Sequence, residues 1–170
     1  MTTMRKRRRK ATAEPAGRDP QSWVCEPTEF AWLPERPYQE LWFELRSWAW
    51  KSVAIVPTVP GVSEFEMAER VVVVGVSNTN RRMTLVSAEG VSVADTDRVI
   101  DMIREAEARG DRVVVVTDSI QDNPSSAPIL RSVNGVVPVV RLGSSDRAGV
   151  NRTVQAVGRN RVIGVVSRAN

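Results

Sequence analysis

Hydrophobic residues change their spacing in a regular way along the second two thirds of the chain. Continuous apolar runs are typical of strands buried on both faces, and apolar residues three and four apart are typical of helices. The runs predict strands over residues 53–56, 83–86, 112–117, 135–141 and 161–166. The helical spacing predicts helices over residues 63–74, 95–109, 127–132 and 146–157. Strands that alternate with helices predict an α/β domain over residues 51–170, with a mostly parallel sheet covered by helices on both faces.

Two of these segments carry conflicting signals. The four valines at 71–74 have strong β propensity, but Ser63 and Glu66 have the spacing of a helix capping box. We therefore predict a helix over 63–74, with Gly75 as its stop, although a glycine can also lie inside a longer helix at some cost in stability. Pro138 lies inside the strand predicted at 135–141 and favours either an edge position or an irregular stretch for it.

An aromatic segment over residues 22–50 precedes this domain. It holds all five tryptophans of the chain and its single tyrosine, and its second half predicts an amphipathic helix over 38–49, with Pro37 near the start. The aromatic side chains either pack this segment onto the domain or form a docking surface for a partner or a second copy. The residues assigned to such an interface are Trp32, Tyr38, Leu41, Trp42, Leu45 and Arg46.

The first 21 residues lack apolar periodicity and are predicted to be a disordered basic tail. The formal net charge of the chain is +4, and six positive charges lie in residues 5–10, so the remainder carries a net charge of −2. The basic character therefore belongs to the tail, which argues against a large nucleic-acid-binding face on the domain. An anionic membrane surface, nucleic acid and an acidic protein are alternative partners for the tail, and a merely solvated tail is the other interpretation. Its basic residues are Arg5, Lys6, Arg7, Arg8, Arg9 and Lys10.

Composition excludes several kinds of site. The chain has no histidine and a single cysteine, Cys25, so we expect neither a zinc site nor a Ser-His-Asp triad. A lone cysteine is expected to be a small buried residue in a reducing compartment. No apolar run reaches the roughly 18 residues of a membrane span. We therefore expect a cytoplasmic protein without a bound metal.

The C-terminal third contains a specific series of motifs. A valine-rich strand ends in Asp118, and it is followed by VNGVVPVVRLG at 133–143 and RVIGVV at 161–166. This series resembles the last third of the MinD/ParA-type P-loop ATPases, and most of all the cytoplasmic tyrosine-kinase domains that accompany polysaccharide co-polymerases. Asn134 and Ser167 stand where that branch has aspartate and asparagine. The resemblance covers residues 37–170 and implies the three-layer sandwich of P-loop NTPases.

The segment YQELWFELR at 38–46 is similar to the oligomerisation helix of the same branch, which begins with an aromatic-Arg-Glu-Leu-Arg pattern. Gln39 and Trp42 replace its two arginines. The similarity implies a homo-oligomer or another protein partner.

The phosphate-binding loop of that family is altered here. A P-loop cradles phosphate with backbone N–H groups and neutralises it with a lysine. The corresponding segment is PTVPGVSE at 57–64, which lacks the lysine, has two prolines without N–H donors, and places Glu64 at a helix start. The resemblance implies a vestigial nucleotide cleft formed by Gly61, Ser63, Glu89, Asp118 and Ser119. Asp118 is equally well explained as a residue that caps a turn.

These features predict a catalytically silent member of the family, a scaffold or regulator that acts through protein contacts and binds no cofactor. The tyrosine-kinase branch phosphorylates a C-terminal tyrosine cluster, and this chain has no tyrosine after Tyr38. The alternatives are a residual nucleotide binder, and an adaptor whose basic tail contacts DNA or the inner face of the cytoplasmic membrane.

Overall fold

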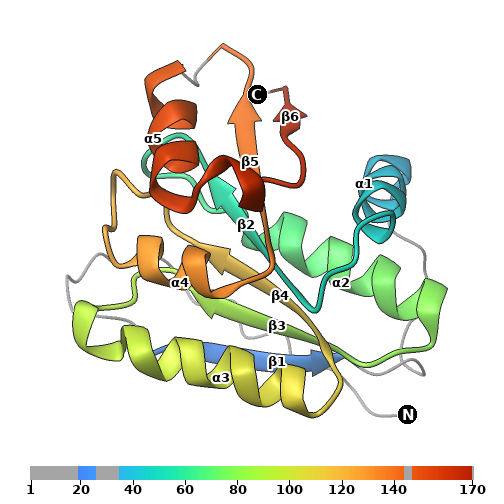
Figure 1. The fold of residues 1–170 in the computed structure, drawn as a ribbon. Helices are drawn as coiled ribbons and strands as arrows, with labels where there is room; N and C mark the ends of the chain where they lie inside the picture. Colours follow the sequence, from blue (N-terminus) through green and yellow to red (C-terminus); the bar gives the residue numbers. More distant parts are fainter. Residues whose placement is uncertain (1–18, 26–34, 144–146, 170) are drawn as a thin grey trace, which may run out of the picture.

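A computed structural model describes residues 19–25, 35–143 and 147–169 of the chain (Figure 1). The described residues contain a six-stranded sheet in the order β1-β3-β4-β2-β5-β6, in which only β1 is antiparallel to its neighbour. The α/β fold with a mostly parallel sheet is therefore confirmed. The strands are β1 (Gln21–Cys25), β2 (Ser52–Pro57), β3 (Met83–Ala88), β4 (Arg112–Thr117), β5 (Gly135–Arg141) and β6 (Val166–Arg168).

Helices cover both faces of this sheet (Figure 1). Successive side chains of a strand point to opposite faces, so Val53 and Ile55 pack under the first two helices, whereas Ala54 and Val56 pack under the other three. The first layer consists of α1 (Arg36–Arg46) and α2 (Phe65–Thr79). The second consists of α3 (Thr96–Ala108), α4 (Ser126–Ser132) and α5 (Arg147–Val157), with short 3-10 turns at η1 (Val93–Asp95) and η2 (Arg159–Arg161). None of the described helices is long and apolar enough to cross a lipid bilayer.

The segment at 63–74 is helical, as predicted, but its ends differ from the prediction. Gly75 is not a stop, because α2 continues to Thr79 and ends at Asn80, whose φ of 50° is left-handed. A Cβ atom at position 75 would lie 2.7 Å from Cζ3 of Trp42 and would also collide with Met83. Glycine is therefore needed here for close packing of α2 against α1 and β3.

The position of β5 corrects the interpretation of Pro138. This strand lies between β2 and β6 and is not an edge strand. The carbonyl of Val139 accepts from Thr58 on the β2 side, and that of Val136 accepts from Ile163 on the β6 side. Because alternate residues face alternate neighbours, the missing N–H of Pro138 faces the β6 side, where residues 163–165 are not in a strand.

The two ends of the sheet depart most from the sequence prediction. β1 forms within the segment interpreted as the tail and aromatic arm, and its register on β3 runs from Gln21 opposite Ser87 to Cys25 opposite Met83. Cys25 is half-buried against the core. At the other end, the strand predicted over 161–166 is reduced to one bridge, Val136 to Val162, and the three residues of β6. The predicted start of the last helix at residue 146 lies outside the described residues.

Candidate functional site

Three loops that follow β2, β3 and β4 meet at the carboxyl edge of the sheet. Parallel strands place their carboxyl ends at one edge, and in open α/β sheets this edge is where ligands bind. The loop after β4 contacts both of the others, through Asp122 to Gly61 after β2 and through Asp118 to Gly90 after β3. The sequence-predicted cleft residues around Gly61, Asp118 and Ser119 are thus brought into one hydrogen-bonded set of loops.

The loop after β2 is held by a carboxylate from the loop after β4. Gly61 has a left-handed φ of 71°, and its N–H donates to Oδ2 of Asp122 at 2.6 Å. The hydroxyl of Ser119 donates to the same Oδ2 at 3.0 Å. A P-loop directs its backbone N–H groups at phosphate. Here the glycine amide already donates to a negatively charged group of the protein.

Asp118 joins the loops after β3 and β4. Its Oδ2 accepts from the N–H of Gly90 at 2.6 Å and from Nδ2 of Asn123 at 3.1 Å. Asn123 also donates to the carbonyl of Val91 at 2.9 Å. These contacts match the turn-capping interpretation of Asp118. Glu89, the other acidic candidate, is half-buried in the turn that contains Gly90.

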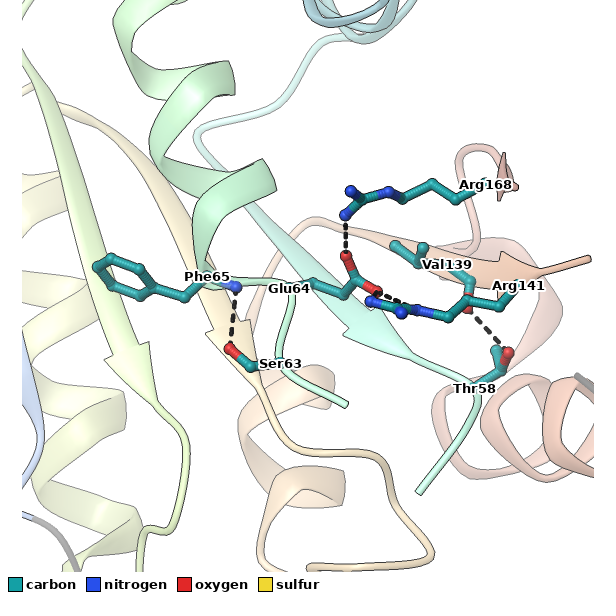
Figure 2. A network of polar contacts seen from close by, with 7 residues as sticks. All are labelled: Thr58, Ser63, Glu64, Phe65, Val139, Arg141 and Arg168. Atoms are coloured by element: carbon teal, nitrogen blue, oxygen red, sulfur yellow. Dashed lines mark hydrogen bonds and ion pairs between the residues drawn. The ribbon is translucent and has the colours of Figure 1, made fainter. Parts of the chain in front are cut away.

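Glu64 is a third carboxylate at this edge, and its side chain is fully buried. Its Oε1 lies 3.3 Å from Nη2 of Arg141 at the end of β5, and its Oε2 lies 3.0 Å from Nη1 of Arg168 in β6 (Figure 2). An ionised carboxylate without partners would be very costly to bury, so the two arginines account for its position. Thr58 fixes the start of the same loop to β5, because its hydroxyl donates to the carbonyl of Val139 at 2.8 Å.

The start of α2 differs from the predicted capping box. The N-cap residue is Glu64, whose side chain makes no capping hydrogen bond. Ser63 accepts from the N–H of Phe65 at 3.2 Å (Figure 2). Glu66 instead pairs with Arg70 at 3.6 Å. Glu64 turns toward β5 and β6, so the acid that meets the loop amide is Asp122 and not Glu64.

The residues missed from the sequence are the partners that come from distant segments. Asp122 and Asn123 lay in a polar loop without a distinguishing motif, and Arg141 and Arg168 lay at the ends of strands. One signal was available. A charged residue directly after an apolar strand reaches the same sheet edge as the loop after the neighbouring strand, so Arg141 was a reasonable partner for Glu64.

The α1 residues assigned to an interface separate into two groups. Trp42 and Leu45 are buried in the core, so their assignment to a partner surface is corrected in favour of packing. Tyr38 and Leu41 are half-buried, and Arg46 is exposed. Tyr38 and Leu41 line a groove of about 290 Å³ between α1, Met67 of α2 and β6. Trp32 and the basic residues 5–10 lie outside the described residues.

The described residues offer no metal site. Across 19–25, 35–143 and 147–169, no three histidine, cysteine, aspartate or glutamate side chains are arranged to hold a metal ion. The acidic side chains at the carboxyl edge instead accept hydrogen bonds from loop amides or pair with arginine.

Comparison with known proteins supports the fold. No protein-family model matches the chain, and a search of curated proteins finds no match. Among solved structures, the chain is similar to one described as the BceF tyrosine kinase domain, with a TM-score of 0.50 and 10% sequence identity. The similarity covers 78% of this chain and 73% of that one. At this identity the chain shares an α/β fold with a tyrosine kinase domain.

Proposed function

We propose that this protein is a non-catalytic scaffold or regulator, derived from a MinD/ParA-type ATPase or from a tyrosine kinase of polysaccharide assembly, and that it acts through protein contacts. The observation that carries the proposal is the bonding of Gly61 to Asp122. The amide that a nucleotide-binding loop would offer to phosphate is held by a carboxylate of the same chain at 2.6 Å.

The charges around the loop support the same conclusion. The only lysines of the chain are Lys6, Lys10 and Lys51, and Lys51 precedes β2, at the sheet edge opposite the loop. Arg141 and Arg168 reach the carboxyl edge, but both are paired with Glu64. Phosphoryl transfer depends on cations that neutralise the transferred group. The Asp122 carboxylate would repel a phosphate at Gly61, and Arg141 and Arg168 are already paired with Glu64.

Titration calorimetry with millimolar ATP and magnesium tests the loss of nucleotide binding. We expect no saturable heat, because a phosphate at Gly61 would have to displace the Asp122 carboxylate. The matched variant is Asp122→Asn, which removes the charge but keeps an oxygen that can accept from Gly61. Saturable heat from the unmodified protein, lost on Asp118→Asn, would instead establish the residual nucleotide binder.

The groove beside α1 is the proposed contact surface for a second copy of this chain. Leu41→Glu is expected to weaken self-association at least about tenfold, because it places a charge in an interface core from which charges are depleted. Sedimentation across a concentration series measures the effect. Val93→Glu is the control, since Val93 is 81% exposed in η1, on the other side of the sheet. Equal self-association of both variants, or a monomeric unmodified protein at every concentration, would contradict the assignment.

A further inference from the structure

Basic residues begin three adjacent strands at the amino edge of the sheet, opposite the loops described above. The N–H of Arg112 donates to the carbonyl of Arg82 at 3.2 Å, and the N–H of Val113 donates to the carbonyl of Lys51 at 2.8 Å. These bonds place the starts of β3, β4 and β2 side by side. They therefore bring residues 81–82, 112 and 51 together, although these are far apart in the sequence.

The Arg112 side chain faces the layer of α1 and α2. Met83, Val114 and Val53 belong to the core beneath those helices, and side chains two positions away on a strand point to the same face. Arg112, the first residue of β4, therefore points to that face, and Arg81 is close enough for its charge to act on Arg112. Lys51 directly precedes β2, beside β4. Arg46, the last residue of α1, joins them there.

Arg112 is held rigidly within this group. Its guanidinium carbon lies 4.8 Å from the ring centre of Trp50 and 5.7 Å from that of Trp42. Its Nη1 is buried and has no hydrogen-bond partner in the described part of the chain. Stacking on aromatic rings stabilises the cation without neutralising its charge.

No carboxylate neutralises this group among the described residues. Arg46, Lys51, Arg81 and Arg112 form no ion pair there, whereas Arg82 and Arg109 both flank the buried Asp111. Burial lowers the pKa of Arg112, and the neighbouring charges of Arg81 and Arg46 lower it further. Arg81 and Arg46 therefore repel Arg112, and an external anion would relieve that repulsion.

Exposed aromatic side chains flank Arg46, one of these four cations. Phe43 is 52% exposed and lies three residues before Arg46, a spacing that makes them neighbours on a helix. Trp48 is 51% exposed and lies two residues after Arg46. Half-exposed aromatic rings beside basic side chains are typical of surfaces that rest in the headgroup region of a bilayer.

We propose that this basic face docks on an anionic phospholipid bilayer. The basic face consists of Arg46, Lys51, Arg81 and Arg112 with the flanking Phe43 and Trp48. The four basic residues lie at the starts of β2, β3 and β4 and at the end of α1, on a body whose net charge outside residues 5–10 is −2. Each helix runs back along the strands, so the first halves of α2 and α3 lie toward the opposite end of the sheet. These halves carry the acidic residues Glu66, Glu69, Asp97 and Asp101. A flat surface can contact the basic end alone, whereas an extended nucleic acid would also pass acidic surface.

Sedimentation with vesicles tests the proposal on the full chain, with all six basic residues at 5–10 replaced by serine so that the tail does not contribute. We expect binding to vesicles that contain phosphatidylserine and not to vesicles of phosphatidylcholine alone. The double variant Arg46→Gln, Arg81→Gln should lower partitioning by about one to two orders of magnitude, because each basic residue near an anionic surface contributes to binding. Trp48→Ser should also lower it, and added salt should weaken all of the binding.

The control variant is Arg36→Gln with Arg104→Gln, which removes the same charge from exposed ion pairs elsewhere on the surface. It should bind vesicles as strongly as its parent. Unchanged melting temperatures establish that each variant is folded. Equal loss in both double variants, equal binding to uncharged vesicles, or binding to a single-stranded oligonucleotide without binding to vesicles would overturn the proposal.

Discussion

Replacing Glu64 with alanine is expected to lower the free energy of unfolding by about 3 kcal/mol, the cost of removing one member of a buried ion pair. The carboxylate is fully buried, and its loss removes the anion that Arg141 and Arg168 share. Their side chains remain 30% and 34% exposed, so water offsets part of the cost. Urea denaturation followed by tryptophan fluorescence measures the change, with the slope of the transition checked for two-state behaviour.

Glu40→Ala is the matched control for this experiment. Glu40 also pairs with an arginine, Arg36, at 2.8 Å, but its side chain is 62% exposed and that of Arg36 is 88% exposed. Exposed pairs contribute little to stability, so the loss should stay below about 0.5 kcal/mol. Similar losses of stability for Glu64→Ala and Glu40→Ala would show that the buried Glu64 network stabilises the fold no more than an exposed ion pair does.

Inorganic phosphate provides an independent readout of the same network. In Glu64→Ala the two arginines and the N-terminus of α2 surround a space left by a carboxylate, and all three favour an anion. Phosphate should therefore stabilise this variant more than it stabilises the unmodified protein, because a ligand that binds only the folded state raises stability. Sodium chloride at equal ionic strength separates specific binding from screening.

The sequence predicts the central strands and helices because their signals are local. The four valines of β4 and the apolar run of β2 lie on strands covered on both faces, and each could be identified without knowing its neighbours. Gly75 was misinterpreted for the converse reason. Its role depends on Trp42 and Met83, which approach it from α1 and β3. A glycine required by packing and a glycine that ends a helix are indistinguishable within a local window.

The two edge strands, β1 and β6, were predicted less well than the central strands for a different physical reason. Most residues of β1 are exposed, so no hydrophobic alternation marks it, and it is defined by its backbone pairing with β3. At the other edge, β6 has only three residues. An edge strand packs on fewer neighbours than a central strand, so fewer of its side chains need to be apolar.

The candidate site was predicted in its parts but not in its connections. Gly61, Asp118 and Ser119 were assigned to one cleft from the resemblance, and hydrogen bonds join their loops at one edge of the sheet. The pairing of Gly61 with Asp122, and of Glu64 with Arg141 and Arg168, joins residues 61 to 104 positions apart. Such contacts depend on side-chain direction at the sheet edge, which spacing alone does not determine.

Replacing Trp42 with alanine is expected to lower the free energy of unfolding by about 3–5 kcal/mol without changing the oligomeric state. The ring is fully buried and lies 6.0 Å from that of Trp50, edge to face. It also packs against Gly75, and the guanidinium of Arg112 lies over its face. Removing it opens a cavity between α1, α2 and β4. Urea denaturation measures the stability, and sedimentation at a concentration where the variant remains folded measures the mass.

Trp48→Ala is the matched control for Trp42→Ala, since it removes the same side chain from a position six residues further along that is half exposed. It should cost less than about 1 kcal/mol, because most surface substitutions have small effects on stability. The two tryptophans would then separate two functions of the aromatic segment. Trp42 holds α1 on the sheet, and Trp48 remains available to the proposed bilayer contact. A large change in mass for Trp42→Ala at unchanged stability would instead restore Trp42 to an interface, and would require α1 to leave the sheet when the partner binds.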